Sequence, residues 1–354
     1  MIKVGIVGFP FSGKTTLLKL LGIISGASHI EDKVLAKVPD KRIDRLVEIY
    51  NPKKISPVSM EFIEIGSIDP AAKEKERIAT IVKLQEVDTP LIVLKAFKSD
   101  MAPDVEGYET ADKQLEYILE EFLIRDLSIL ENKIDKLKNA KRKLTNIEEI
   151  ELKIVEKVKS YLEENGNLLG LELTEDERKM IQGYSLNSMK NMVVLVNVGE
   201  DGIKGDYEGK EKVEKICKER NMGLVVLPVG IVKELMELDE EEREIFIQEY
   251  GLEDFGLEDL MKRIFDATGM MVFFTAGEKE VHAWEVKKGA TALDAAAAIH
   301  SDLARGFIRA EIFSFEDIDR EGSEKVLKEK GLIHVVGKEH VINDGDIVFI
   351  RFNV

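Results

Sequence analysis

The sequence predicts an α/β protein with a parallel sheet, an inserted antiparallel helical hairpin and a small strand-rich C-terminal domain. Strand-like and helix-like segments alternate from residue 1 to 97, which is typical of a parallel sheet with helical crossovers. Two long amphipathic segments interrupt that alternation within residues 109–184, and the chain becomes strand-rich from residue 271.

The first strand leads into a glycine-rich loop. Residues 8–15 read GFPFSGKT between the apolar run 2–7 and a helix-like segment that begins at Thr16. This spelling fits G-x-x-x-x-G-K-[ST], in which backbone N–H groups at a helix N-terminus bind phosphate. Lys14 is then expected to reach the β and γ phosphates, and Thr15 to offer its hydroxyl to Mg²⁺. The sheet is thus predicted to be of the P-loop NTPase kind, against the alternative of a glycine-rich turn without a ligand.

The next elements continue the alternation. Residues 34–38 form a short predicted strand, and Asp40 can cap a helix whose apolar residues share one face. A strand with alternating burial is expected at 58–65 and a helix at 71–85. The uninterrupted apolar run 90–97 is typical of a central parallel strand.

The inserted segment has the pattern of two antiparallel helices. Apolar residues recur every three or four positions from Leu119 to Leu137 and from Ile147 to Leu162. Thr145 and Glu148 form a capping box before the second helix. We expect the apolar stripes to be the seam between the helices rather than a surface for a partner. The basic turn at 138–143 is either a solvated cluster or a contact for RNA.

The α/β pattern resumes after the hairpin. The apolar strand 192–196 ends at Asn197-Val198-Gly199-Glu200, at the strand end where open α/β sheets bind ligands. A helix at 210–220, a strand at 224–227 and helices at 239–250 and 257–267 follow. We predict a nucleotide-binding domain of residues 1–108 and 185–270, a hairpin domain of 109–184 and an α+β domain of 271–354. The last domain has four expected strands and one helix, at 290–303.

Composition excludes several classes of protein. Fifty-one basic and 68 acidic residues give a net charge of −17, so we expect no double-stranded DNA partner. Cys217 is the only cysteine, which rules out intrachain disulfides and cysteine-cluster metal sites. The sequence has neither a membrane-length apolar run nor a signal peptide, so it predicts a cytoplasmic protein with no membrane partner.

Short blocks along the chain resemble a known family. They are FTAGEKEV at 274–281, IHSD at 299–302, GFIRAE at 306–311 and RFNV at 351–354, with VPD at 38–40 and NVGEDG at 197–202. They are similar to the YchF family of Obg-related P-loop nucleotide hydrolases. The C-terminal blocks resemble its TGS domain, which is a ubiquitin-like β-grasp module.

The resemblance implies a nucleotide and its contacts. Ordinary GTPases have Asn-Lys-x-Asp where this chain has Asn197-x-x-Glu200, and the aspartate accepts hydrogen bonds from guanine. The family's preference for ATP goes with that change, so we expect ATP rather than GTP. Mg²⁺ is expected at Thr15 and, through water, at Glu64. The implied partner is the ribosome or another translation-related RNA–protein assembly. The implied nucleotide contacts are Phe11, Ser12, Gly13, Lys14, Thr15, Thr16, Asn197, Val198 and Glu200.

Three segments depart from the family pattern. Residues 64–67 read EIGS where the family has Asp-x-Ala-Gly, the loop 25–33 has no threonine for Mg²⁺, and residues 229–232 replace the Ser/Cys-Ala-Lys loop. Hydrolysis depends on a positioned water and on Mg²⁺, and no residue clearly positions the water, so no catalytic residue is assigned. The sequence therefore leaves two functions open. One is a slow ATPase, and the other is an inactive nucleotide-binding scaffold whose helical and TGS domains bind an RNA or protein partner.

Overall fold

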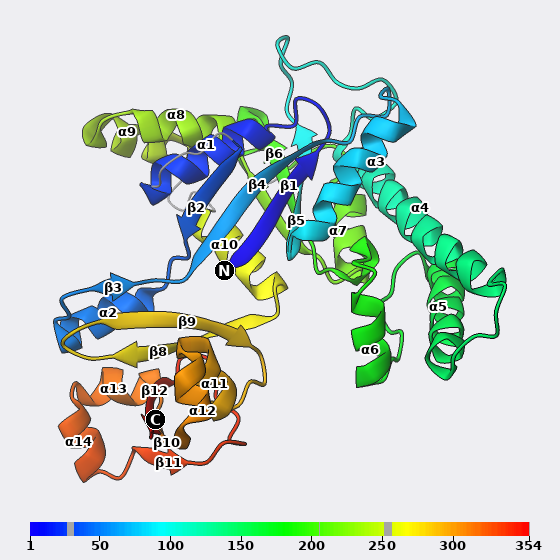
Figure 1. Cartoon of the computed structure of the whole chain (residues 1–354). Helices are drawn as coiled ribbons and strands as arrows, with labels where there is room; N and C mark the ends of the chain where they lie inside the picture. Colours follow the sequence, from blue (N-terminus) through cyan, green and yellow to red (C-terminus); the bar gives the residue numbers. More distant parts are fainter. Residues whose placement is uncertain (27–31, 205, 251–256, 354) are drawn as a thin grey trace. The chain divides into compact units, whose positions relative to one another are not determined.

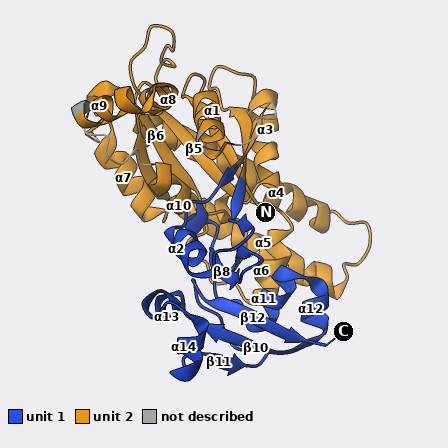
Figure 2. Ribbon diagram, turned by 90° about the vertical axis from the view of Figure 1, so that its left-hand side faces the viewer, with its two compact units in different colours: residues 1, 36–60, 265–354 blue, residues 2–35, 61–264 orange. Residues whose placement is uncertain are grey.

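The computed structural model describes residues 1–26, 32–204, 206–250 and 257–353. The chain forms two compact units, which Figure 2 colours separately. The larger unit comprises residues 2–35 and 61–264, and the smaller unit comprises residues 1, 36–60 and 265–354. The chain passes between them within strands β2 (Lys33–Lys37) and β4 (Ser59–Ser67) and within helix α10 (Leu257–Ala267).

The larger unit is built on a sheet with the strand order β2-β4-β1-β5-β6-β7. Strands β1, β5, β6 and β7 pair in parallel, which confirms the predicted α/β sheet. Every residue of β6 and all but the last of β5 are buried, as expected for central parallel strands. The strands are β1 (Ile2–Gly8), β5 (Thr89–Ala96), β6 (Val193–Val198) and β7 (Gly223–Leu227).

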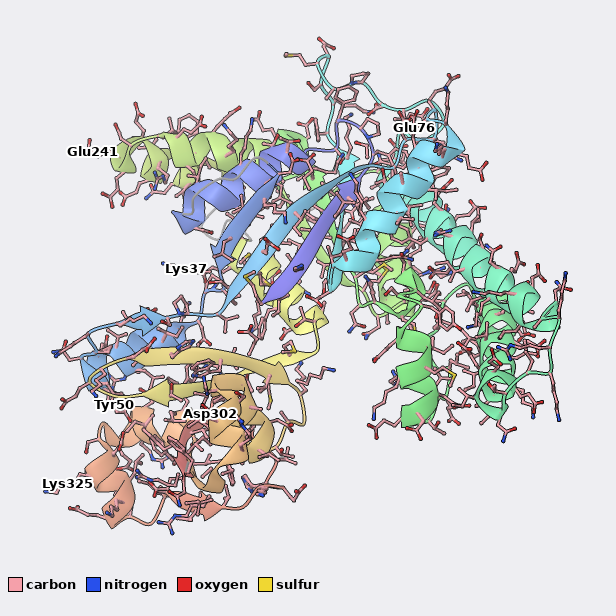
Figure 3. All side chains as sticks on the ribbon, viewed as in Figure 1. Lys37, Tyr50, Glu76, Glu241, Asp302 and Lys325 are labelled. Atoms are coloured by element: carbon pink, nitrogen blue, oxygen red, sulfur yellow. The ribbon has the colours of Figure 1, made fainter. Side chains whose placement is uncertain are left out.

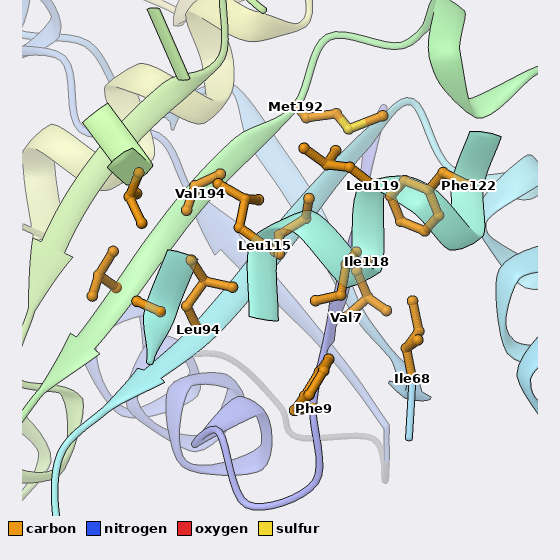
Figure 4. Packing of buried hydrophobic residues seen from close by; sticks show 14 of the residues in the cluster. Val7, Phe9, Ile68, Leu94, Leu115, Ile118, Leu119, Phe122, Met192 and Val194 are labelled. Atoms are coloured by element: carbon orange, nitrogen blue, oxygen red, sulfur yellow. The ribbon is translucent and has the colours of Figure 1, made fainter. Parts of the chain in front are cut away.

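Helices cover this sheet and complete its core. Helices α3, α4 (Ala111–Lys138) and α7 contribute to one apolar cluster with β1, β5 and β6, which Figure 4 shows from close by. Helices α1 and α8 pack against each other. Cys217 is buried in α7, and burial raises the pKa of its thiol to about 12. The helices are α1 (Lys14–Ser25), α3 (Glu74–Lys83), α7 (Lys210–Glu219) and α8 (Val229–Glu237).

The predicted hairpin is present as α4 (Ala111–Lys138) and α5 (Asn146–Asn165), followed by α6 (Glu175–Gln182) (Figure 1). The expected capping box begins α5, with Glu148 N–H donating to Thr145 Oγ1. The apolar stripes meet in the seam, which confirms that interpretation; its buried residues are Leu130, Ile134, Ile154, Val155, Val158, Leu162, Ile181 and Leu186.

The basic turn between α4 and α5 is partly neutralised. Arg142 pairs with Glu148, whose carboxylate lies 2.6 Å from the guanidinium, and Lys138 pairs with Glu156 at the same distance. An RNA contact at this turn stays a prediction.

The smaller unit has a mixed sheet in the order β11-β10-β12-β8-β9-β3. Its four expected strands are present as β8 (Met270–Ala276), β9 (Val281–Lys287), β10 (Phe307–Phe313) and β12 (Ile347–Phe352), and β11 (His334–Val336) is an addition. Strands β8 and β9 form an antiparallel pair, and β12 lies parallel to β8. This arrangement of strands agrees with the β-grasp prediction.

The prediction of a single helix after residue 271 was wrong. The segment 290–303 is divided into α11 (Ala292–Ile299) and α12 (Ser301–Arg305), because His300 is extended, with φ −167°, and accepts a hydrogen bond from the N–H of Asp302. Helices α13 (Phe315–Glu321) and α14 (Glu324–Glu329) were not predicted. They are too short to show a clear helical period.

Residues 36–60 belong to the smaller unit, whereas the sequence grouped them with the nucleotide-binding domain. They form α2 (Lys41–Tyr50) and β3 (Ile55–Ser56), and β3 adds to the sheet beside β9. Arg42 donates to Asp40 and Asp344, and Arg45 donates to Asp319. Pairs between such distant residues leave no local signal in the sequence, which is why the sequence did not place residues 36–60 with the C-terminal segment. The predicted domain boundaries stay a prediction.

Exposed charged side chains occur on both units, for example Glu241 on α9 (Glu240–Tyr250) and Lys325 on α14 (Figure 3). Among the described residues, none of the helices has both the length and the apolar character needed to cross a membrane.

The seam predicts the effect of truncating Leu130, which is fully buried. We expect Leu130→Ala to lower the free energy of opening of α4 and α5 by about 2–5 kcal/mol, because a cavity replaces buried methyl groups. Amide hydrogen exchange in these helices measures it. The control is Ile147→Ala on α5, where the side chain is 69% exposed and we expect a loss of about 0.5 kcal/mol or less. Equal losses in both variants would contradict the seam.

Candidate functional site

The loop between β1 and α1 depends on two close backbone approaches. A Cβ added to Gly13, where φ is +97°, would lie 2.3 Å from Nδ2 of Asn197. A Cβ added to Gly8 would lie 2.2 Å from the carbonyl oxygen of Val93. Phe11 also has a positive φ of 58° and is 56% exposed. Both glycines are therefore required, and Phe11 is held in a conformation that costs backbone strain.

A cavity of about 630 Å³ lies beside this loop, within the size range of small-molecule sites. Every predicted nucleotide contact except Ser12 lines it, and Glu64 does as well. Parallel strands place ligand sites at their carboxyl ends, and β1, β4, β5 and β6 all end here. The predicted residues at the cavity are Phe11, Gly13, Lys14, Thr15, Thr16, Glu64, Asn197, Val198 and Glu200.

Ser12 lies behind the loop rather than in the cavity. It is fully buried, and its carbonyl oxygen accepts a hydrogen bond from Asn197. Its Oγ has no hydrogen-bond partner within the described chain. The structure therefore gives its side chain a place in the packing, and a phosphate contact from its backbone N–H stays a prediction.

The side-chain amide of Asn197 forms hydrogen bonds with the main chain through both its nitrogen and its oxygen. Its Nδ2 donates to the carbonyl oxygen of Ser12 at 3.0 Å, and its Oδ1 accepts from the N–H of Val229 at 3.1 Å. The side chain is only 4% exposed. Asn197 thus joins the P-loop, the end of β6 and the start of α8. We interpret it as a positioning residue at the cavity, and a direct contact with a base stays a prediction.

Lys14 is a buried cation at the cavity wall. It is 5% exposed, and its Nζ donates to the carbonyl oxygen of Phe9 at 2.6 Å. Burial lowers the pKa of Lys14 to about 8, partly offset by the charge of Glu64. Its ammonium group has three donors and forms no ion pair in the described structure. An anionic group in the cavity would satisfy the remaining donors, so the residues present fit a phosphate.

Thr15 and Glu64 lie together although they are distant in sequence. The Thr15 hydroxyl donates to Oε1 of Glu64 at 2.8 Å, and such oxygens are the ligands that Mg²⁺ prefers. The described residues contain no group of three His, Cys, Asp or Glu side chains that could hold a metal alone. A Mg²⁺ ion here would need phosphate and water oxygens as well, which fits its usual coordination.

Two of the three segments that depart from the family pattern lie at the cavity. Ser67 lines the cavity, and residues 229–232 form the first turn of α8, where Gly230 and Ile231 also line it. The threonine-free loop 25–33 was expected to affect the metal site, and its residues 27–31 lie outside the described residues.

The sequence missed four residues of the cavity, namely Phe97, Lys98, Ala102 and Glu234. Phe97 and Lys98 directly follow β5, whose neighbours are β1 and β6. The strand-end rule that identified Asn197 would have found these two. Ala102 lies in a loop and Glu234 on the second turn of α8, where the sequence offers no comparable signal.

The bridge made by Asn197 predicts the effect of one substitution. In Asn197→Asp, an oxygen replaces Nδ2 and faces the carbonyl oxygen of Ser12, so we expect a loss of about 1–3 kcal/mol in the unfolding free energy. Urea unfolding of the full chain measures it. Glu200→Gln, at an exposed position by the same strand end, is the control and should change stability by about 0.5 kcal/mol or less. If the two variants were equally stable, the bridge would not hold the loop.

Comparisons with known proteins agree with this fold. The family model YchF-GTPase_C, described as "Protein of unknown function (DUF933)", matches residues 270–353. The chain is 33% identical over 365 residues to the ribosome-binding ATPase YchF of Bacillus subtilis (strain 168), with 100% of both chains covered. It is 34% identical over 363 residues to that of Escherichia coli O157:H7, with 99% of each covered. The solved Schizosaccharomyces pombe YchF GTPase has a TM-score of 0.86 at 26% identity, covering 99% of this chain and 97% of that one. The chain therefore belongs to the YchF family.

Proposed function

We propose that this protein binds ATP with Mg²⁺ in the P-loop cavity, hydrolyses it slowly, and associates with the ribosome in a nucleotide-dependent way. The observation that carries the proposal is the buried ammonium of Lys14, which lies at the cavity wall without an anionic partner among the described residues. The name of the relatives, ribosome-binding ATPase YchF, supports the choice of reaction and partner.

The phosphates of the nucleotide occupy the P-loop side of the cavity. The N-terminus of α1 offers backbone N–H groups, and Lys14 exchanges the carbonyl oxygen of Phe9 for phosphate oxygens. Thr15 would offer its hydroxyl as a ligand to Mg²⁺, and Glu64 would accept a hydrogen bond from water bound to the ion. Mg²⁺, when bound, neutralises charge that develops on the phosphates.

The base occupies the opposite side, among Phe97, Ile231 and Glu200. Phe97 and Ile231 offer apolar surface, and Glu200 is exposed at the rim. A guanine site needs an acceptor that pairs with both the ring N–H and the exocyclic amine of guanine. Leaving these donors unpaired is costly. Glutamate places its carboxylate one methylene farther out than aspartate, which favours ATP over GTP.

An aromatic cluster connects the P-loop with the helical hairpin. The ring of Phe9 lies 5.5 Å from that of Tyr108 and 5.7 Å from that of Tyr117 on α4, and the two tyrosine rings are 4.9 Å apart. Edge-to-face contacts at these distances are favourable. The carbonyl oxygen of Phe9 is also the acceptor for Lys14. A phosphate that draws Lys14 away therefore acts on a residue packed against α4.

The segment after β4 also contacts α4. Arg77 on α3 donates to Oε1 of Glu121 on α4 at 3.1 Å and to the carbonyl oxygen of Ala72 at 2.6 Å. Ala72 lies five residues after Ser67, which lines the cavity. The P-loop and the segment that follows Ser67 thus both contact α4, which supports a hairpin that responds to the nucleotide.

Nucleotide binding is tested by isothermal titration of the full chain with ATP or GTP and Mg²⁺. We expect saturable binding of ATP, weaker binding of GTP, and a loss of affinity of about tenfold or more in Lys14→Ala, which is about 1.4 kcal/mol. Lys19→Ala, at an exposed lysine on the same helix, is the matched control and should bind like the unaltered chain. Equal affinities for the two lysine variants would contradict the phosphate site.

A second candidate function is a nucleotide-binding scaffold without turnover. It is favoured by one observation, that no glutamine or histidine is among the described residues that line the cavity. Single-turnover measurement of phosphate release separates the two functions. Release that is abolished in Lys14→Ala supports the slow ATPase, whereas ATP binding without release supports the scaffold.

The partner is tested by cosedimentation with purified ribosomes in the presence of Mg²⁺ with ADP or a non-hydrolysable ATP analogue. We expect the bound fraction to differ between the two nucleotides. In Tyr117→Leu the difference should disappear while nucleotide affinity is kept, because the contact with Phe9 is weakened. Tyr184→Leu is the control, since Tyr184 pairs with Glu151 on α5. Absence of sedimentation in every state would refute the ribosome, and an unchanged difference in Tyr117→Leu would refute the aromatic route.

A further inference from the structure

A second cavity, of about 300 Å³, lies in the larger unit and shares no lining residue with the nucleotide cavity. Its walls come from α4, from the loop 166–173 after α5, and from the segment 188–192 that leads into β6. Its volume is at the lower end of the range of about 300–1,000 Å³ for small-molecule sites.

The floor of this cavity is apolar. Leu119 and Phe122 on α4 lie beside Met192 there, as Figure 4 shows, and Met222 and Leu171 extend the floor. Methionine side chains adapt to ligands of different shape.

The polar part of the cavity is cationic. Arg178, Lys190 and Arg220 line it, and no aspartate or glutamate is among its described lining residues. The whole chain has a net charge of −17, so three cations without an acid are not a consequence of composition. The cavity lining is therefore positively charged although the chain as a whole is negatively charged.

These cations have no anionic partner in contact. Arg220 donates to the carbonyl oxygen of Gly166 at 2.9 Å, and Lys190 donates to the carbonyl oxygens of Leu84 and Val87. Within the described chain, none of Arg178, Lys190 and Arg220 takes part in an ion pair. Burial lowers the pKa of Lys190 to about 8, offset at a distance by Asp88 and Asp126. Arg178 is exposed, and Lys190 and Arg220 are half-buried. An anion from outside would give these cations the ion pair that the described chain does not supply.

The loop that lines one wall of the cavity is fixed by its own hydrogen bonds. The hydroxyl of Tyr161 donates to the carbonyl oxygen of Leu169 at 2.5 Å, and Oδ1 of Asn167 accepts from the N–H of Leu169 at 2.9 Å. Gly170 has φ +79°, and a Cβ there would lie 3.1 Å from the Tyr161 hydroxyl. The conformation of this cavity wall is therefore well defined.

We propose that this cavity binds a small amphipathic anion, a molecule with a carboxylate or phosphate head and a short apolar body. The head pairs with Arg178, Lys190 and Arg220. The guanidinium groups of the two arginines can each donate two parallel hydrogen bonds to a carboxylate or a phosphate. The body lies on the floor formed by Leu119, Phe122 and Met192. An RNA backbone has the negative charge but not the aliphatic surface that this floor would bury.

The proposal is tested with the full chain labelled at its methionine methyl groups, titrated with octanoate, octyl phosphate, octylamine or octan-1-ol. We expect one-site binding of at least one anion, with shifts in the Met192 and Met222 methyl signals. The amine and the alcohol should bind at least about tenfold more weakly than the preferred anion. The tighter of the two anions identifies the head group. Equal binding of octan-1-ol, or no binding by either anion, would overturn the proposal.

A substitution checks the cationic wall. Arg178 is exposed and makes no side-chain hydrogen bond within the described chain, so Arg178→Gln should fold normally and bind the preferred anion at least about threefold more weakly. Lys141→Gln, at an exposed lysine in the basic turn, should bind it unchanged. Equal affinities, or displacement of the anion by a single-stranded RNA oligonucleotide, would overturn the proposal. ATP titration of the same variants shows that the nucleotide site is intact.

Discussion

The geometry of the P-loop cavity depends on the hydrogen bonds made by the side-chain amide of Asn197. It reaches back to the carbonyl oxygen of Ser12 in the P-loop and forward to the N–H of Val229 at the start of α8. The loop can approach this amide only because residue 13 is glycine. A buried amide that is satisfied on both sides is costly to disturb. One side chain at the end of β6 therefore fixes the relative positions of the P-loop and of the first turn of α8, both of which line the cavity.

Helix α4 links this site with the rest of the larger unit. Near its start Tyr117 packs on Phe9, and further along Asp126 accepts hydrogen bonds from the backbone N–H groups of Asn187 and Ser188 and from the Ser188 hydroxyl. Burial raises the pKa of Asp126 although these bonds oppose the shift. Asp126 thus ties α4 to the segment that enters β6. The end of α4 forms the hairpin seam, so one continuous helix contacts the loop, the second cavity and the hairpin.

The smaller unit depends on pairs that join its distant segments. Arg42 donates to Asp344, and Lys54 donates to Glu280, whose carboxylate also accepts from Ser56. Burial opposes the protonated state of Arg42, but its bonds to Asp40 and Asp344 prevail and raise its pKa. These contacts and the pairing of β3 with β9 join residues 36–60 to the smaller unit. Strand β3 is the part of this segment that enters a sheet formed mainly by C-terminal strands.

The sequence determined the elements whose cause is local. Hydrophobic period predicted the parallel strands and the hairpin, the G-x-x-x-x-G-K-[ST] spelling predicted the loop, and strand ends predicted that Asn197 lies beside it. Only the tertiary structure decided the rest, because it depends on pairs far apart in sequence. It assigned residues 36–60 to the smaller unit, turned the side chain of Ser12 out of the cavity, and brought Phe97 and Glu234 into it. It also gathered Arg178, Lys190 and Arg220 around one apolar floor, since hydrogen bonds and charge contacts between remote segments leave no period in the chain.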